Sequence, residues 1–321
     1  MTAAGPPRVL YVTGWCRSGS TVLGNLLGEL TGVVHVGELH YLWRNGVLRQ
    51  GTNTSCGCGE QVADCPLWSK VLATVATPDP ARVARRMLDV QRGYLRTRHT
   101  GARLRESVAH RTAPADGAPA VTAALDRMVG CYRAITAQTG ARLVVDGSKY
   151  PAEAAALLRR EDLDLRILHL IRDPRASAHS WRRPKAYIPA MGVTRSTGYW
   201  TAANVASDRI GRAAPDRYLR LRYEDFTRDP RAALARVLAL AGLPDPPPVT
   251  ADGEAVLGVN HTVTGNPDRL VHGPVRIRPD DGWKARLPAG PGLLATLIAS
   301  PVLSRYGYPF RRQGGHPWIS E

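Results

Sequence analysis

The sequence lacks any apolar run that approaches the roughly 20 residues needed to cross a lipid bilayer. Its opening residues, MTAAGPP, also lack the basic segment and the long apolar segment of a secretory signal peptide. The short apolar run that follows, RVLYVTG, is better explained as a first β-strand. From these absences we expect a cytoplasmic protein.

Lysine is scarce, because only four of the 43 basic residues are lysine, whereas the formal net charge is +16. Arginine binds phosphate through a bidentate fork, so the excess favours a small polyanionic ligand. Nucleic acid would also fit the charge, and a compositional bias toward Ala, Arg, Gly and Pro would explain it without any ligand. Since no RNP, zinc-finger or basic-zipper pattern is present, we expect no nucleic-acid partner.

Cysteine occurs at five positions: Cys16, Cys56, Cys58, Cys65 and Cys131. Without a secretion signal, a disulfide framework is not expected. Three of the cysteines lie close together in SCGCGEQVADCPLW, where a zinc site would need His35 or His40 as its fourth ligand. The pattern favours a structured loop with free thiols, and we predict no metal ion.

Short apolar, β-branched runs alternate with helical patterns along most of the chain. The predicted strands cover residues 9–13, 33–36, 143–145, 166–171 and 218–222. Helix starts are indicated by Pro151 and by the Asp-Pro pairs at 173–174 and 229–230, and Gly242 ends the last of these helices. The alternation predicts an α/β fold with a mostly parallel central sheet in a three-layer α/β/α arrangement, as one domain of residues 1–321.

Two segments depart from this alternation. Residues 76–138 show Arg-rich helical patterns around a loop at 112–119, which predict a helical insertion that either contributes to a ligand pocket or covers the sheet. The tail from Pro244 is rich in Pro and Gly, so we expect irregular loops that close over a ligand. Its first residues, Pro244–Pro248, are interpreted as a linker within the domain.

The segment Gly14–Thr21, GWCRSGST, has the frame of a phosphate-binding Walker A loop but lacks its lysine. Ser20 stands in the lysine position, which argues against ATP hydrolysis. The glycines permit a tight loop whose backbone N–H groups converge on an anion at a helix N-terminus. Arg17 supplies positive charge from a different place in the loop.

The motif RSGST before an apolar helix resembles the 5′-phosphosulfate-binding loop of sulfotransferases that use 3′-phosphoadenosine-5′-phosphosulfate (PAPS). The segment LIRDPRASAHS is similar to the family's 3′-phosphate-binding segment, through Arg172 and Ser180. If Asp173 caps a helix there, Ser180 lies two turns on, on the same face. Without a ligand, Arg172 and Asp173 would form only a surface ion pair and a cap. The resemblance implies that PAPS is bound by Cys16, Arg17, Ser18, Gly19, Ser20, Thr21, Arg172 and Ser180.

Two further segments extend the resemblance to residues 8 to about 286 and leave the insertion uncovered. LRYEDF is similar to the family's YED segment, which implies that Tyr223 lies near the adenine. HTVTGNPDRL and DDGWK resemble the carboxyl-terminal segment of bacterial members, which implies that Arg269 lies beside the 3′-phosphate. Arg17 replaces the loop Lys of the hormone-sulfating branch, and Cys16 stands where Pro is common. These departures place the chain nearer the carbohydrate, tyrosylprotein and bacterial metabolite branches.

Sulfuryl transfer needs a base for the acceptor proton and cations for the charge that develops on the transferred group. Glu38 in HVGELH is the predicted base, because a Glu in a GE pair has this role in tyrosylprotein sulfotransferases, and His40 is its rival. Arg17 and Lys149 are the predicted charge stabilisers, with a hydrogen bond from Ser148. Alternatively, Lys149 forms only a local ion pair with Asp146. We expect that no metal is required, because the leaving group carries less charge than a triphosphate.

The resemblance leaves the acceptor open. We expect a hydroxyl, or less readily an amine, of a small-molecule, carbohydrate or lipid-like acceptor. Four aromatic residues either face this acceptor or belong to the core: Trp181, Tyr187, Tyr199 and Trp200. Two other functions fit the loop, namely a P-loop small-molecule kinase and a non-catalytic binder of an anionic nucleotide.

Overall fold

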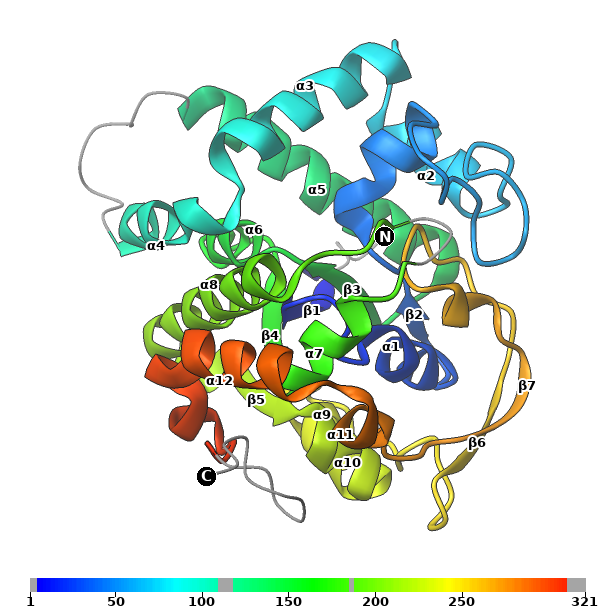
Figure 1. The fold of residues 1–321 in the computed structure, drawn as a ribbon. Coiled ribbons are helices and arrows are strands. Elements are labelled where there is room, and N and C mark those ends of the chain that lie inside the picture. Colours follow the sequence, from blue (N-terminus) through cyan, green and yellow to red (C-terminus); the bar gives the residue numbers. More distant parts are fainter. Residues whose placement is uncertain (1–4, 109–117, 185–187, 311–321) are drawn as a thin grey trace, which may run out of the picture.

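The computed structural model describes residues 5–108, 118–184 and 188–310, and contains a five-stranded parallel sheet. The strands have the spatial order β2-β3-β1-β4-β5, so that β1 lies in the centre (Figure 1). Their bounds are Arg8–Gly14 for β1, Val33–His35 for β2, Leu143–Lys149 for β3, Asp164–Ile171 for β4 and Tyr218–Arg222 for β5. This arrangement confirms the predicted parallel α/β fold and all five predicted strands.

The central strand is apolar on both faces. Val9 and Tyr11 belong to one buried cluster, whereas Leu10 and Val12 belong to another. Successive side chains of a strand point to opposite faces, so the two clusters are the two layers of core on either side of the sheet.

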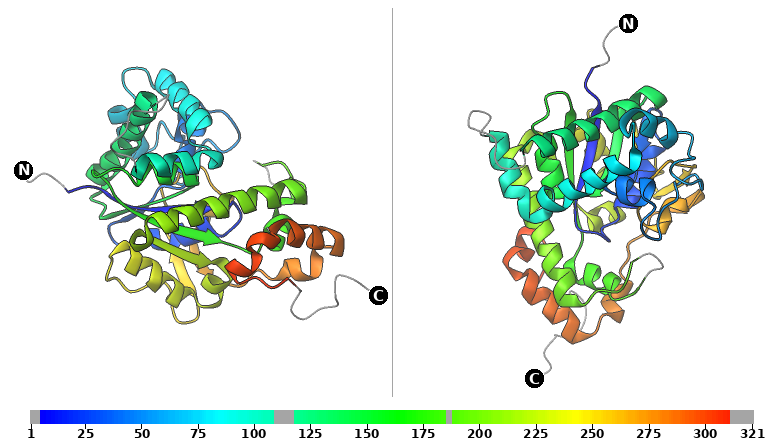
Figure 2. Two further views of the ribbon diagram at one scale, coloured as in Figure 1. Left: turned by 90° about the vertical axis from the view of Figure 1, so that its left-hand side faces the viewer. Right: turned by 90° about the horizontal axis from the view of Figure 1, so that it is seen from above.

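Helices cover both faces, as Figure 2 shows with the insertion in cyan and teal on one side and α10 in yellow on the other. One layer of core includes side chains from α1 (Ser20–Gly28), α9 (Tyr223–Arg228) and α10 (Pro230–Ala241). The opposite layer has more helices: α2 (Trp68–Val75), α3 (Pro80–Tyr94), α4 (Thr100–Val108), α5 (Ala118–Thr139), α6 (Pro151–Leu157) and α8 (Val193–Ala213).

The helix starts follow the predicted cap chemistry. Asp173 accepts a hydrogen bond from the backbone N–H of Arg175 and precedes α7 (Pro174–Trp181). Asp229 accepts one from Ala232 at the start of α10, and that helix ends at Gly242 with φ of 66°. These caps satisfy N–H groups that would otherwise lack partners, and they confirm the predicted boundaries.

The helical insertion is confirmed as α3, α4 and α5, although residues 109–117 of its predicted loop lie outside the described residues. Most of its buried side chains join the core cluster on one face of the sheet. Of the described residues of the insertion, Thr97 alone lines the main cavity discussed below. The insertion therefore chiefly covers the sheet.

The expectation of an irregular tail holds for residues 258–266, part of which lines the cavity described below, but is wrong for much of the rest. The chain after Pro244 forms an antiparallel ribbon of β6 (Glu254–Leu257) and β7 (Gly273–Arg276), followed by α11 (Gly282–Arg286) and α12 (Ala289–Leu303). Helix α12 packs against α7 and α8 and is apolar on nearly all sides, so its sequence has no amphipathic period to detect. None of the described helices combines the length and the apolarity that crossing a membrane requires.

The buried carboxylate of Asp146, in strand β3, offers a test of what stabilises the fold. The hydroxyl of Tyr132 donates a hydrogen bond of 2.6 Å to Asp146, which is fully buried, and burial raises the pKa of Asp146 to about 6. Tyr132→Phe removes the donor and leaves a carboxylate oxygen without it. We expect the free energy of unfolding to fall by about 1–3 kcal/mol in urea titrations.

Tyr94→Phe is the control, because the Tyr94 hydroxyl has no hydrogen bond among the described residues. Equal stability of Tyr132→Phe and the wild type would show that this hydrogen bond does not support the fold.

Candidate functional site

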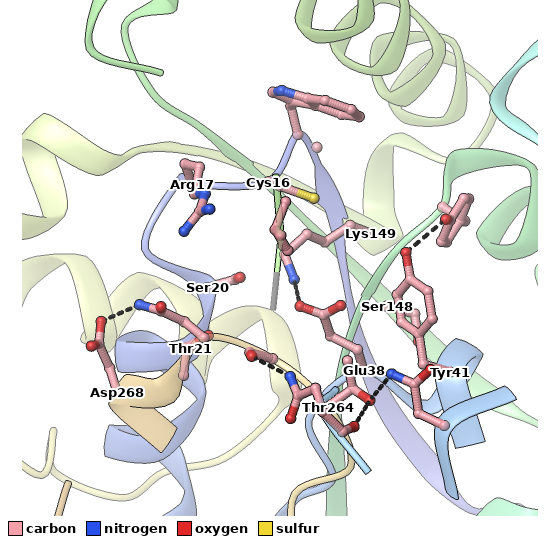
Figure 3. A pocket seen from close by; sticks show the side chains of 18 of the residues that line it. Cys16, Arg17, Ser20, Thr21, Glu38, Tyr41, Ser148, Lys149, Thr264 and Asp268 are labelled. Carbon is pink, nitrogen blue, oxygen red and sulfur yellow. Dashed lines mark hydrogen bonds and ion pairs between the residues drawn. The ribbon is translucent and has the colours of Figure 1, made fainter. Parts of the chain in front are cut away.

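The five parallel strands end at the same edge of the sheet, and a cavity of about 450 Å³ opens there. The loop after β1 forms one wall, and residues that follow β2 and end β3 form another, including Glu38 and Lys149 (Figure 3). Thr264 and Gly265, from the tail, complete the lining. The volume suits a small-molecule ligand, and the position beyond the strand ends is typical of ligand sites in such sheets.

The loop after β1 is held tightly against its neighbours. A side chain at Gly14 would clash with the carbonyl of Leu170 in β4, and a Cβ at Gly19 would lie 2.6 Å from the ring of Tyr223. Both glycines have positive φ, which few other residues adopt. Ser18 donates a hydrogen bond of 2.9 Å to Trp15 and so supports the loop, whereas Ser20 and Thr21 line the cavity.

Backbone strain gathers around this cavity. Among the described residues, four that are not glycine have positive φ, and three of them line it: Arg17, Lys149 and Thr264. Such conformations cost free energy and persist where the surrounding structure imposes them, which is common at functional sites. Strain thus marks this edge of the sheet independently of the loop motif.

Two arginines near the loop carry hydrogen-bond donors for which the described chain provides no acceptor. Nε and Nη2 of Arg17 and Nε of Arg172 are buried and have no partner among the described residues. The Arg17 guanidinium lies 5.0 Å from the centre of the Trp181 ring. Helix α1 begins at Ser20 without a side-chain cap. Buried donors of this kind need an acceptor, so the residues fit an anionic ligand.

Glu38 and Lys149 form an ion pair inside the cavity, with 2.6 Å between Lys149 Nζ and Glu38 Oε1 (Figure 3). Their side chains are only 15% and 9% exposed. Burial is the largest single effect on the pKa of Lys149 and lowers it, but the charge and hydrogen bond of Glu38 together with Cys16 and Asp146 raise the pKa overall. Lys149 does not pair with Asp146, whose carboxylate instead accepts hydrogen bonds from Tyr132 and Ser148. The alternative of a local Lys149–Asp146 pair is therefore wrong.

Ser148 lines the cavity, whereas His40 lies outside its lining. The Ser148 hydroxyl donates to Asp146 and accepts a hydrogen bond of 2.9 Å from the backbone N–H of His40. The imidazole of His40 lies 2.7 Å from Glu153 and stacks on Tyr150, with ring centres 3.8 Å apart. His40 is buried and does not line the cavity, whereas Glu38 does.

A second cavity of about 190 Å³ lies beyond the ends of β4 and β5 and includes Tyr223. Arg172 lies between the two cavities. Its Nη1 donates to the carbonyl of Arg17 at 3.1 Å, its Nη2 lies 2.7 Å from Asp280, and its guanidinium centre lies 4.3 Å from the centre of the Tyr223 ring. Arg172 thus pairs with Asp280 and not with Asp173, which contacts Arg175.

The other two predicted 3′-phosphate residues are Ser180 and Arg269. No hydrogen bond joins Ser180 to Arg172 in the part of the chain that the structure describes. Arg269 donates to the carbonyls of Thr262 and Ser55 and to the side chain of Asn53, at 2.9–3.1 Å. These contacts hold two loops together beside the main cavity, and they do not support a place for Arg269 at the 3′-phosphate.

The predicted acceptor-side aromatics separate into two groups. Trp181 lines the cavity and stacks on Trp15, with ring centres 5.7 Å apart, and Tyr199 packs on the same Trp15. Trp200 belongs to the core, where its indole N–H donates to the carbonyl of Arg172. Tyr187 lies outside the described residues.

Sequence reasoning missed two tyrosines and an asparagine of the cavity. The hydroxyls of Tyr41 and Tyr150 lie 3.0 Å apart, and burial raises the pKa of both. Asn45 donates to Thr264 and so ties the tail to the cavity wall. Tyr150 directly follows Lys149, and Tyr41 follows Glu38 by three residues, so proximity to the predicted catalytic residues was the available signal.

Comparison with known proteins agrees with this geometry. The model of the family described as "Sulfotransferase family" matches residues 9–247, which is more than half of the chain. Mouse (Mus musculus) carbohydrate sulfotransferase 5 is 36% identical over 107 residues, which cover 27% of this chain and 27% of the mouse protein.

Among solved structures, the sulfotransferase domain of the Synechococcus PCC 7002 olefin synthase superposes with a TM-score of 0.54 at 23% identity. The alignment covers 96% of this chain and 98% of that domain, which shows a shared fold. The sulfotransferase domain from the curacin biosynthetic pathway is more distant, with a TM-score of 0.47 at 18% identity over 95% of this chain and 99% of that one. Because the family match spans the phosphate loop and all five strands of the sheet, the chain belongs to the sulfotransferase family.

Proposed function

We propose that this enzyme transfers the sulfuryl group of PAPS to a hydroxyl of a small-molecule, carbohydrate or lipid-like acceptor. The observation that supports it most is the set of buried, unpartnered guanidinium donors on Arg17 and Arg172 beside the Glu38–Lys149 pair. The donors of Arg17 suit a phosphosulfate, and the donor of Arg172 suits a second phosphate. Residues 1–321 would act as one domain, because strand ends and the tail build the site together.

The donor would lie along the carboxyl edge of the sheet. The first-turn N–H groups of α1, Arg17, Ser20 and Thr21 face the 5′-phosphosulfate, while Cys16 lines the adjacent wall. Arg172 would bind the 3′-phosphate, and the ring of Tyr223 would face the adenine. Asp280 now occupies part of the Arg172 fork, but its side chain is 61% exposed and free to yield to a phosphate.

The chemistry follows from the Glu38–Lys149 pair. Glu38 accepts the proton of the acceptor hydroxyl as the acceptor oxygen bonds to sulfur, and the bond from sulfur to the bridging phosphate oxygen breaks. Protonation cancels the charge of Glu38 and so weakens its hold on the ammonium of Lys149. Lys149 is then available to stabilise the negative charge on the leaving adenosine 3′,5′-bisphosphate, together with Arg17.

The acceptor side is the part of the cavity lined by Tyr41, Tyr150 and Trp181. Aromatic rings with polar edges suit sugar rings as well as aromatic and lipid-like groups. The named activity of the mouse relative favours a carbohydrate, although the match covers only 27% of that protein. A hydroxyl near Glu38 is the common requirement for all of these acceptors.

The donor site is tested first by calorimetric titration with adenosine 3′,5′-bisphosphate in the absence of magnesium. We expect micromolar binding, with 5′-AMP and ATP at least tenfold weaker, because only the bisphosphate engages both Arg17 and Arg172. Tight binding of magnesium ATP with no binding of the bisphosphate would instead identify a kinase.

Replacement of the base is the second test. Glu38→Gln keeps a hydrogen-bond acceptor for Lys149 but cannot take the proton, so turnover with PAPS should fall about 10²-fold or more. Affinity for the bisphosphate should stay within a fewfold of the wild type. Glu161→Gln, at an exposed position, serves as the control. Full activity of Glu38→Gln would remove Glu38 from the mechanism.

The 3′-phosphate assignment is tested by Arg172→Ala. The loss of a charged fork should weaken the bisphosphate about 10- to 100-fold and change 5′-AMP much less. Arg133→Ala is a matched control, since Arg133 also pairs with an aspartate at 2.7 Å but on the surface of the insertion. Equal weakening of both nucleotides would place Arg172 outside the 3′-phosphate site.

A further inference from the structure

Three of the five cysteines meet a distant histidine. The ligand atoms of Cys56, Cys58, Cys65 and His261 all lie within 4.8 Å of one another. The sequence had offered His35 or His40 as the fourth member, which is wrong. His35 contacts Asn25 and His40 contacts Glu153, so neither reaches the cysteines. His261 was missed because about 200 residues separate it from the loop.

The spacing of the cluster fits a tetrahedral ion. With Zn–S of about 2.3 Å and Zn–N of about 2.0 Å, the ligands of a tetrahedral zinc lie roughly 3.5–3.8 Å apart. Nδ1 of His261 lies 3.8 Å from Sγ of Cys56 and 3.2 Å from Sγ of Cys65. All five cysteines are free thiols, so no disulfide competes for the cluster.

The backbone around the cluster is firmly held on both sides. Cys56 N–H donates to Glu60, and Gly57 N–H donates to Thr262, at 2.7 and 2.9 Å. The indole N–H of Trp68 donates to the carbonyl of His261 at 2.7 Å. Ligands that are fixed in this way before binding lower the entropic cost of capturing an ion.

We propose that Cys56, Cys58, Cys65 and His261 bind one structural Zn²⁺ ion. A set of three thiolates and one imidazole is a typical closed zinc site, and the protein fills all four positions, so no place remains for a reacting water. Cys56 and Cys65 are fully buried, and Cys58 and His261 are half-buried. The ion is separate from the transfer chemistry, and this inference does not depend on the proposed donor or base.

The ion would stabilise the tail segment 261–265, which forms part of the cavity wall. His261 lies two residues before Val263, whose carbonyl accepts a hydrogen bond of 2.8 Å from the backbone N–H of Glu38. Three residues before Cys56, the side chain of Asn53 donates a hydrogen bond of 2.8 Å to the carbonyl of Gly265. Fixing His261 to the cysteines therefore fixes the segment that positions Glu38 and lines the cavity.

The first arm of the test is metal content, measured by inductively coupled plasma mass spectrometry on the full chain purified without a histidine tag. We expect one equivalent of zinc. Cys65→Ser and His261→Ala should reduce it to roughly a tenth or less. Cys131→Ala, at a buried cysteine of α5 outside the cluster, and His272→Ala should retain it. Absence of zinc after growth in zinc-supplemented medium would overturn the proposal.

The second arm uses the wild type, so it remains decisive if the variants fail to fold. Removal of the ion with a strong chelator should lower the thermal midpoint by about 5 °C or more, and added zinc should restore it. Cobalt loaded in its place should show the visible bands of a tetrahedral thiolate complex. An unchanged midpoint, or a cobalt spectrum typical of octahedral oxygen ligands, would refute a structural site of these residues. Binding of adenosine 3′,5′-bisphosphate, measured in parallel, reports on the donor site separately.

Discussion

The close approach of β1 to β4 at Gly14 is the constraint on which the active edge of the sheet depends. A side chain there would clash with the carbonyl of Leu170, so only glycine lets the central strand turn into the phosphate loop while it remains paired. Because β1 lies between β3 and β4, the same turn brings the loop beside Lys149 on one side and Arg172 on the other. The close approach at Gly14 thus helps to bring Arg17, Lys149 and Arg172 to one edge of the sheet.

Some of the buried cationic groups at this edge of the sheet have hydrogen-bond acceptors and others do not. Lys149 is buried but compensated by Glu38, whereas Arg17 and Arg172 keep buried donors that nothing satisfies in the described chain. A buried donor without an acceptor destabilises the fold. An anion that accepts these hydrogen bonds removes this cost, so ligand binding should stabilise the protein. In the proposed mechanism, proton uptake by Glu38 would also weaken its ion pair with Lys149 and leave the ammonium group available to the leaving group.

Local signals were sufficient for the parts of the fold that depend on neighbours in sequence. The five strands, the Asp-Pro caps and the loop Gly14–Thr21 were predicted because each is encoded within a few residues. Helix α12 was missed because it is apolar on all sides, and the β6–β7 ribbon because it lies in a Pro- and Gly-rich tail. Of the predicted site residues, Arg17, Glu38 and Lys149 line the main cavity and Tyr223 lines the second, and each lies at or just after the end of a strand. The contacts of Arg269 with Asn53, Ser55 and Thr262 depend on packing between distant segments, which no local pattern records.

The tail shows most clearly why distance in sequence limits such prediction. Residues 260–265 have no periodicity, yet they bridge to Gly37 and Cys56 through Val263 and supply Thr264 and Gly265 to the cavity. A segment without a hydrophobic face of its own needs other bonds to stay in place. Here these are backbone hydrogen bonds, the guanidinium of Arg269 and the meeting of His261 with three cysteines. The loop that carries Cys56, Cys58 and Cys65 and the tail segment 260–265 are both irregular, and each holds the other in place. Through Val263, they also hold Glu38 in the cavity.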